Sequence, residues 1–411
     1  MPLNFPSNPT NGQVYDRFFW DSAAGIWKNT VFPASLDSLS DATITSPSSG
    51  QLLRYNGTQW VNHTPVLSNI SDVVPTTPAI GDALVYNGTN WINAPRSGNV
   101  IINGDFGIWQ RGTSFSNPAS SSYTVDRYSV VYDGSGASRT LSREPFSSGE
   151  LTVPGYGSPS FFLRYRQQVA GSGGTFNNLE QRIEDVTTFS NQQVTVSFWA
   201  RTSTSSTITV VFGQLFGTGG SSSVFTSTGG SISLTNSWVR YSRTVTLPGV
   251  SGKTIGANNS LALIFAIPLN SVSTIDIWGV QVEAGPVATP FRLAGGGSQA
   301  AELALCQRYY YRISSTDGFC ASANESTVLT NGVVNFPVTM RTAPSALEQS
   351  GVAGNYNVYE GATAITCSNV PVFLTGGPTS SFIRFQVASG LTLGRASILR
   401  GSGFLAWSAE L

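Results

Sequence analysis

The chain has 411 residues, of which 11% are charged, with 22 acidic and 22 basic side chains. An ordinary soluble domain has about 25% charged residues, and a balanced charge creates no field that attracts nucleic acid or an anionic membrane. The longest apolar run, residues 261–269, is far shorter than the ~20 residues of a membrane-spanning helix. We therefore expect no nucleic-acid binding and no membrane insertion.

The start of the chain, residues 1–9, has neither the basic segment nor the apolar segment of a secretory signal. The three cysteines, Cys306, Cys320 and Cys367, are odd in number and have no regular spacing. This pattern favours free thiols in a protein that is made in a reducing cytoplasm.

A repeat dominates the first hundred residues. Residues 50–62 recur as residues 81–93, each with the pattern Tyr-Asn-Gly-Thr-x-Trp, and similar lead-in segments extend the two units to about 39–62 and 70–93. Asn-Gly supplies the two positive-φ residues of a type I′ turn, so each copy is predicted to form a tight β-hairpin.

These hairpins carry aromatic side chains that need a surface to pack against: Tyr55, Trp60, Tyr86 and Trp91. A lone two-stranded hairpin is only marginally stable in water. Either the units fold together into one small β domain, or equivalent hairpins from several chains share a core. We favour the second interpretation, with residues 1–98 as an attachment and shaft region.

Longer alternating strands are predicted from residue 99 to residue 292. In residues 193–201 the apolar side chains share one face and the others share the opposite face. Residues 207–212, 238–245 and 275–283 alternate likewise. Strands separated by turn signals, without helices between them, indicate a β-sandwich.

Residues 293–298 have the composition of a linker, and Ser298 can cap a helix over residues 299–312. Further strands are expected at 333–340, 382–387 and 404–407, which makes residues 299–411 a C-terminal β domain. The predicted fold class is all-β: a shaft of hairpin repeats, a central sandwich, and a C-terminal β-sandwich knob preceded by a short helix.

Several segments resemble a domain of bacteriophage tail fibres and related receptor-binding tail proteins. The matching segments, in order, are residues 99–113, 123–127, 179–186, 196–201, 216–221, 251–256 and 280–291, with residues 302–310 as a further hallmark after the domain. The N-terminal segment 5–15 and the Tyr-Asn-Gly-Thr-x-Trp repeats are similar to fibre-shaft units of the same proteins. The last hundred residues match only as a generic fibre tip.

The resemblance implies a jelly-roll sandwich similar to carbohydrate-binding modules, a homotrimeric fibre, and a place in the virion as part of a phage tail. Such a protein is synthesised in the cytoplasm of the host. Its expected partners are other tail or baseplate proteins, through the N-terminal region, and a glycan or receptor on the host surface.

No catalytic residue is predicted. His63, the only histidine, would be needed for a Ser-His-Asp site but follows a repeat unit. Glu180, Glu184 and Asp185 form a cluster of carboxyl groups, as a glycosidase requires, yet a salt-bridged strand face explains the same residues.

Sugar binding requires exposed aromatic faces beside planar hydrogen-bonding groups. Trp199 with Arg201, opposite the apolar face of their strand, is one candidate, although loops can cover the outer face of a sandwich. Tyr356 and Tyr359, in a Gly-flanked polar segment of the tip, are the other candidates. The alternative there is an ordinary strand with Tyr356 and Val358 on one face.

Zinc is not expected, because cysteine and histidine are too few and too scattered. A structural calcium ion is the one metal considered, held where the first and last strands of the sandwich meet. Asp105 and Asp276 are the candidate ligands. No other cofactor is expected.

The sequence therefore predicts a trimeric tail fibre that adheres to a host surface glycan through multivalent, non-catalytic binding. One alternative is a depolymerase of capsule or lipopolysaccharide. The other is a purely structural tail or baseplate linker.

Overall fold

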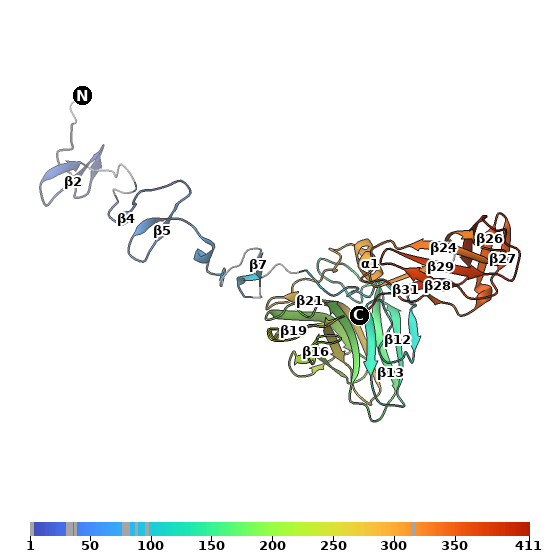
Figure 1. Cartoon of the computed structure of the whole chain (residues 1–411). Coiled ribbons are helices and arrows are strands. Elements are labelled where there is room, and N and C mark those ends of the chain that lie inside the picture. The colour runs from blue at the N-terminus through green and yellow to red at the C-terminus, as the bar shows by residue number, and fades with distance from the viewer. Residues whose placement is uncertain are drawn as a thin grey trace. The chain divides into compact units, whose positions relative to one another are not determined.

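The computed structural model describes residues 4–29, 36, 39–75, 83–86, 89–94, 98–314 and 318–411. It divides into two compact units, one made of residues 1–78 and 86–93, the other of residues 79–85 and 94–411. The regular secondary structure of the described parts is β-strand apart from one α-helix and short 3-10 turns, so the predicted all-β fold class is confirmed (Figure 1). No helix in these ranges is both long and apolar enough to cross a bilayer.

The N-terminal part consists of small sheets. The first contains β1, β2 and β3, and the Phe5 ring stacks on Trp27 at 5.1 Å. In the second, β5 and β6 form the predicted antiparallel hairpin, and β4 adds to β6 in parallel. The bounds are β1 (Val14–Tyr15), β2 (Phe18–Asp21), β3 (Ile26–Asn29), β4 (Ala42–Thr43), β5 (Leu52–Tyr55), β6 (Trp60–His63), η2 (Leu67–Asn69), β7 (Ala83–Tyr86) and β8 (Trp91–Ala94).

The turn between β5 and β6 differs from the prediction. Gly57 has a φ of +100°, but Asn56 is not among the residues with positive φ, so the turn is not type I′. Instead, the Asn56 side chain accepts hydrogen bonds from the backbone N–H groups of Thr58 and Gln59, both at 2.9 Å. Asparagine therefore shapes this loop through its side chain. The matching turn at residues 87–88 lies outside the described residues, as do residues 81 and 82 of the repeat.

Both hairpins present a solvent-exposed aromatic pair. Tyr55 and Trp60 are 51% and 44% exposed, and their ring centroids lie 5.6 Å apart. Tyr86 and Trp91 repeat the arrangement at 53% and 42% exposure and 5.5 Å. We call these four residues the hairpin aromatics.

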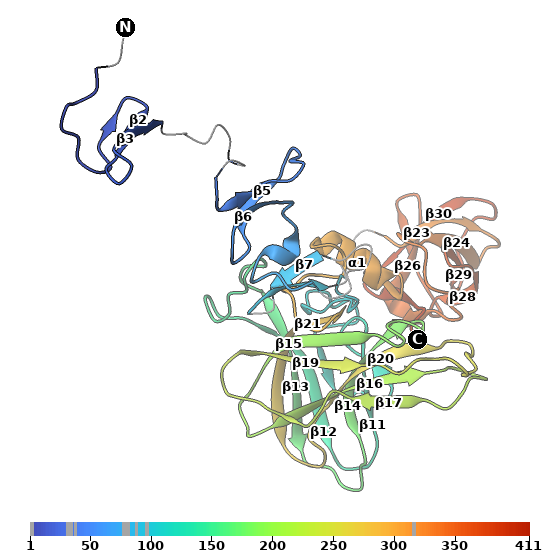
Figure 2. The ribbon, with the colours of Figure 1, turned by 90° about the vertical axis from the view of Figure 1, so that its left-hand side faces the viewer.

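Residues 99–293 form a sandwich of two antiparallel sheets, whose strands run in colour from teal through green to gold in Figure 2. One sheet has the strand order β19-β15-β21-β13-β12-β9, and the other has the order β10-β11-β14-β20-β16-β17 with β18 beside β16. From β12 to β21 the chain crosses repeatedly between the sheets, as the jelly-roll-like prediction requires. The bounds are β9 (Ser114–Ser116), β10 (Ser122–Tyr123), β11 (Tyr128–Tyr132), β12 (Ser138–Pro145), β13 (Phe161–Val169), β14 (Asn177–Glu184), β15 (Gln193–Thr202), β16 (Thr207–Leu215), β17 (Val224–Ser227), β18 (Ile232–Ser233), β19 (Val239–Thr246), β20 (Ser260–Ala266) and β21 (Ser273–Ala284).

The alternation of β15 decides which of its side chains enter the sandwich core. Val194, Val196, Phe198 and Ala200 all lie in the main hydrophobic cluster and are fully buried, as predicted. On β21 the inward positions change from Ile277 to Val280, because the register shifts by one residue opposite β15. The extra residue belongs to a β-bulge that includes Gly279, whose φ is +65°.

The outer face of the six-stranded sheet is covered by the protein itself. Trp199, Trp278 and Phe162 project outward from three neighbouring strands and pack with Val153, Phe291 and Leu293 into a second hydrophobic cluster. The segments around residues 153 and 291 come from outside the sheet. The two tryptophan side chains on this face are therefore buried.

Residues 293–298, predicted to be a linker, are held at two points. Leu293 is buried in the second cluster, and the Gly295 N–H donates to Glu302 Oε2 at 2.6 Å. The predicted helix follows as α1 (Gln299–Gln307), where the Ser298 side chain accepts a hydrogen bond from Ala301 N. The helix ends five residues before the predicted position.

The C-terminal region packs a seven-stranded sheet, in the order β27-β26-β30-β23-β24-β29-β28, and a three-stranded sheet, in the order β22-β31-β25, around its own core. Trp407 on β31 is fully buried and donates through Nε1 to Ser381 Oγ on β29 at 2.8 Å. The bounds are β22 (Tyr310–Ser314), β23 (Cys320–Asn324), β24 (Leu329–Asn335), β25 (Glu348–Gln349), η4 (Ala353–Asn355), β26 (Tyr356–Glu360), β27 (Thr363–Thr366), β28 (Val372–Gly376), β29 (Ser380–Gln386), β30 (Ala396–Gly401) and β31 (Phe404–Ser408).

The strand expected at residues 333–340 is wrong in its second half. β24 ends at Asn335, two residues before Pro337. Proline has no N–H to donate to the ladder, so the strand cannot continue through it in the middle of a sheet. The expected strands near 382–387 and 404–407 are confirmed as β29 and β31.

Candidate functional site

Buried ion pairs join the sandwich to the C-terminal fold. Glu410, whose side chain is 5% exposed, pairs with Arg127, which is 1% exposed. It also accepts from Arg111 Nη2 at 3.2 Å. The Arg127 guanidinium lies 3.4 Å from the centroid of the Tyr309 ring. Since a buried charge is costly without a partner, these contacts fix the two folds to each other.

Three hollows adjoin one another along this junction and share lining residues. The first has a volume of about 350 Å³ and meets the second, of about 380 Å³, at Arg312. The second meets the third, of about 110 Å³, at Ser121 and Tyr123. We call these hollows together the seam groove. Its main lining side chains are Trp109, Gln110, Arg111, Tyr123, Arg182, Tyr310, Arg312, Glu348 and Phe404.

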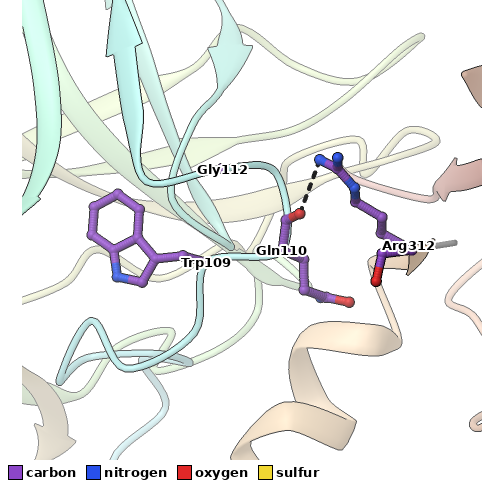
Figure 3. Close-up of a pocket in the computed structure, with 5 residues that line it drawn as sticks. Trp109, Gln110, Gly112 and Arg312 are labelled. Carbon is purple, nitrogen blue, oxygen red and sulfur yellow. Dashed lines mark hydrogen bonds between the residues drawn. The ribbon is translucent and has the colours of Figure 1, made fainter. Parts of the chain in front are cut away.

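In the first hollow, aromatic and planar polar groups stand side by side. Figure 3 shows the Trp109 ring and the Arg312 side chain on opposite sides of Gln110. Arg312 Nη1 donates to the Gln110 carbonyl oxygen at 3.2 Å and to the Arg111 carbonyl oxygen at 3.3 Å. Gly112 also lines this hollow. The guanidinium of Arg312 is therefore held in place by the backbone of the sandwich.

The second hollow combines stacked arginines with a tyrosine–carboxylate pair. Arg111 lies over the Tyr310 ring at 3.6 Å, and Arg312 lies over the Phe404 ring at 3.9 Å. Tyr310 donates its hydroxyl hydrogen to Glu348 Oε2 at 3.0 Å. Burial raises the pKa of Tyr310, so the phenol keeps its proton and remains a donor.

Asp126, behind the groove, orients Gln110. Its two carboxylate oxygens accept from the Gln110 backbone N–H and from Gln110 Nε2, each at 2.6 Å. Gln110 Nε2 also donates to the Tyr310 carbonyl oxygen at 2.7 Å. Burial raises the pKa of Asp126 to about 6, although the positive charge of Arg111 opposes the shift.

The sugar-binding residues expected on the sandwich are not exposed. Trp199 is 8% exposed and lies in the second hydrophobic cluster, so it offers no free ring face. Arg201 donates from Nε to Asp276 Oδ2 at 2.8 Å and also pairs with Glu150. In the structure, other segments of the chain cover the outer face of the sandwich, which was the alternative to sugar binding at Trp199.

The two tyrosines expected in a tip loop lie instead on strand β26. Tyr356 is fully buried in the C-terminal core and donates its hydroxyl hydrogen to the Phe404 carbonyl oxygen at 2.7 Å. The expectation that Tyr356 contacts a receptor is therefore wrong, because the pleat points it inward with Val358. Tyr359 is on the other face and half-buried, with Arg400 5.3 Å from its ring centroid.

The two candidate calcium ligands have other partners. Asp276 accepts from Arg164 Nε at 2.7 Å and from Arg201 Nε at 2.8 Å, one arginine from each neighbouring strand. Asp105 accepts from the Tyr156 hydroxyl at 2.8 Å and from Gln299. Within the described ranges, no group of three or more His, Cys, Asp or Glu side chains is placed to hold a metal ion.

The cluster of carboxyl groups on β14 is divided between different contacts. Glu180 pairs with Arg182 at 3.2 Å, and burial raises its pKa. Glu184 pairs with Arg308 at 3.0 Å; burial opposes its ionisation, but hydrogen bonds from Arg308 and Tyr309 outweigh that effect and lower its pKa. These contacts agree with the salt-bridged strand that was the alternative to a glycosidase pair.

The residues of the seam groove were not selected from the sequence, although a signal was present. Trp109, Gln110 and Arg111 lie in the motif at 99–113, and Tyr310 ends the motif at 302–310. The two motifs are almost 200 residues apart, and the fold brings them together. The presence of both motifs in one chain was the signal, but a single sequence does not show which motifs contact each other.

No family model and no curated protein matches the chain. Among solved structures, a CBM4 module has 17% sequence identity and a TM-score of 0.26, covering 44% of this chain and 98% of that chain. The enzymatically active domain of bacteriophage CBA120 tailspike protein 4 has 18% identity and a TM-score of 0.28, covering 46% and 24%. TmCBM61 in complex with beta-1,4-galactotriose has 9% identity and a TM-score of 0.27, covering 46% and 100%. All three TM-scores are below 0.5, so the groove is interpreted from this chain alone.

Proposed function

We propose that the chain is a structural virion protein, a homotrimeric phage tail fibre that adheres to a host surface glycan by multivalent, non-catalytic binding. The observation that carries this proposal is the seam groove. It places the half-buried rings of Tyr123 and Phe404 beside guanidinium and carboxylate groups in the second hollow, next to the Gln110 amide of the first. Sugars need both kinds of contact, because a pyranose has apolar ring faces and a rim of hydroxyl groups that donate and accept hydrogen bonds.

The hairpin aromatics support the trimeric part of the proposal. Exposed aromatic side chains that repeat in register on a shaft are costly in water unless another surface covers them. Equivalent hairpins of neighbouring chains provide such a surface. Three grooves on one fibre then raise the overall affinity for a repetitive glycan without a tight single site.

The adhesion test uses the fluorescently labelled full chain on host cells, with soluble host polysaccharide as competitor. Arg312→Ala removes a planar donor of the groove, and Ser314→Trp places a bulky side chain at the exposed edge of the first hollow. Each is expected to weaken labelling by about tenfold or more. Arg166→Ala is the matched control, since it removes an exposed arginine that lies outside the groove.

The proposal fails if the wild-type chain leaves host cells unlabelled, or if both groove variants bind as well as wild type. The claim that binding is non-catalytic is tested by a separate measurement. Incubation of host polysaccharide with the protein is expected to leave its chain length and its number of reducing ends unchanged, and shortened chains would favour the depolymerase.

A further inference from the structure

A second cavity, of about 300 Å³, lies beside the outer face of the six-stranded sheet. None of its lining residues belongs to the seam groove. We call it the outer pocket, and its principal lining residues are Asp105, Gly107, Tyr156, Phe161, Trp278 and Gln299. They come from the start of the sandwich, from the β12–β13 connection and β13, from β21 and from the first position of α1.

The polar wall of the outer pocket is a preorganised set of hydrogen-bonding groups. Asp105 is 3% exposed, and its carboxylate accepts from Gly107 N at 3.2 Å and from the Tyr156 hydroxyl at 2.8 Å. Gln299 Nε2 donates to the same carboxylate. Each polar group is thereby fixed by another, which lowers the entropy that a ligand must lose to use them.

The absence of a side chain at Gly107 leaves free space beside these polar groups. A Cβ atom at position 107 would lie 3.1 Å from Gln299 Oε1 and 3.4 Å from Asp105 Oδ1, which accepts from Gly107 N, whereas Oδ2 already accepts from both Tyr156 and Gln299. These two acceptors therefore border the space above the glycine, which is solvent-exposed. Two adjacent acceptors suit a ligand that presents two neighbouring O–H donors.

The aromatic part of the lining is rigid. Tyr156 packs against Trp278 and Phe291 with ring centroids 5.1 Å and 5.4 Å away. Trp278 is fully buried, and its Nε1 donor has no hydrogen-bond partner among the described residues. The half-buried Phe161 adds a further apolar surface. The pocket thus pairs the half-buried rings of Tyr156 and Phe161 with fixed acceptors at the scale of one sugar ring.

We propose that the outer pocket is a second saccharide site, which takes one uncharged pyranose unit through two adjacent hydroxyl groups. The hydroxyls donate to Asp105 Oδ1 and Gln299 Oε1, and the sugar ring lies against the half-buried rings of Tyr156 and Phe161. An uncharged sugar fits because the acceptor at the centre of the site is a carboxylate, which repels an acidic sugar. This site extends the proposed glycan adhesion and does not depend on the seam groove.

Saturation-transfer NMR on the full chain tests the site with uncharged tri- and tetrasaccharides of glucose, mannose, galactose and N-acetylglucosamine. Gly107→Ala narrows the space beside both acceptors and is expected to weaken binding by about tenfold. Gly230→Ala is the matched control, because nothing lies within 4 Å of a Cβ at that position. Gln299→Ala removes one acceptor at an exposed position and is expected to weaken binding by a similar factor.

The outcomes separate this site from the seam groove. If an oligosaccharide binds wild type, Gly107→Ala and Gln299→Ala equally, the outer pocket is not its site and the proposal is wrong. If none of the probes binds while labelled protein still adheres to host cells, the outer pocket proposal fails and glycan adhesion through the groove stands. If the wild-type chain neither binds a probe nor labels host cells, the outer pocket proposal and the adhesion proposal are both wrong.

Discussion

Asp126 shows how one buried side chain couples ionisation to the geometry of the seam groove. Its carboxylate holds both the backbone and the side-chain amide of Gln110, which lines the groove. Burial nevertheless raises its pKa from 3.8 to about 6. The folded protein therefore binds this proton more tightly than the unfolded chain does.

This difference predicts a pH dependence of stability. A raised pKa stabilises the folded state fully below the unfolded value near 3.8, and that contribution is lost as the pH rises through about 6. Asp126→Asn does not titrate, so its free energy of unfolding relative to wild type is expected to rise between about pH 4 and about pH 7, by up to about 3 kcal/mol. Urea denaturation across this range measures the effect.

Asp133→Asn is the control with the opposite sign. Asp133 is only half-buried, and a hydrogen bond from Thr175 lowers its pKa, so its contribution is lost as the pH falls. The Asp133→Asn variant is expected to approach or exceed wild-type stability only at acidic pH. Parallel stability profiles for wild type and Asp126→Asn would contradict the assignment of a raised pKa to Asp126.

The β-bulge of β21 is the feature at the scale of elements with the clearest energetic consequence. One extra residue lets Ile277 and Val280 both face the core, while Trp278 remains on the outer face beside Trp199. The two indole rings lie 5.3 Å apart in an edge-to-face arrangement. The bulge thus allows β21 to contribute side chains to both hydrophobic clusters.

Gly279→Ala is expected to destabilise the sandwich by roughly 2–4 kcal/mol, since it combines a left-handed backbone with overpacking. The new Cβ would lie 2.6 Å from Trp199 Cε3. Gly252→Ala is the matched control, because Gly252 also has a positive φ, of +75°, but has open space around it. Thermal unfolding should show a much larger loss for Gly279→Ala, and equal losses would mean that contact with Trp199 contributes nothing.

Most elements of the sandwich could be predicted from the sequence, because alternation along β15 reports directly on a buried face. The outcome for Trp199 could not be predicted, since the pattern separates two faces without showing which loops cover the second. The turn after Tyr55 was mispredicted for a related reason. Asn-Gly is compatible with a type I′ turn, but the Asn56 side chain bonds Thr58 and Gln59 and forms a longer loop.

At the scale of the whole molecule, the hairpin aromatics make oligomerisation testable. Trp60→Ser combined with Trp91→Ser removes one ring of each exposed pair, at positions 44% and 42% exposed. If these rings pack between chains, the double variant is expected to shift from three chains toward one at micromolar concentration, as measured by sedimentation velocity. The physical reason is the loss of buried aromatic area, worth roughly 1.5–3 kcal/mol per fully buried large side chain.

Phe225→Ser controls for the general effect of losing an exposed aromatic residue. Phe225 is 61% exposed and belongs to the sandwich, outside the repeats. Its substitution is expected to leave the oligomeric state unchanged. A wild-type chain that sediments as a single chain would remove the basis for a shared hairpin core.

The seam groove marks the limit of what one sequence reveals at this scale. Its walls combine residues near position 110 with residues near positions 310 and 404, and no local pattern indicates that they meet. Composition likewise gives expectations about classes of partner but cannot place a site. The folded structure shows which distant segments of the chain contact each other, and the sequence alone does not.

The Arg127–Glu410 pair also has a consequence for how the protein is made. Glu410 follows Arg127 by 283 positions, and a ribosome adding about 5–20 residues per second needs roughly 15–60 s to cover that interval. Until then Arg127 lacks this carboxylate, so the buried ion pair forms only after residue 410 has been synthesised. The C-terminal β region thereby supplies the last partner of a buried charge in the sandwich that precedes it.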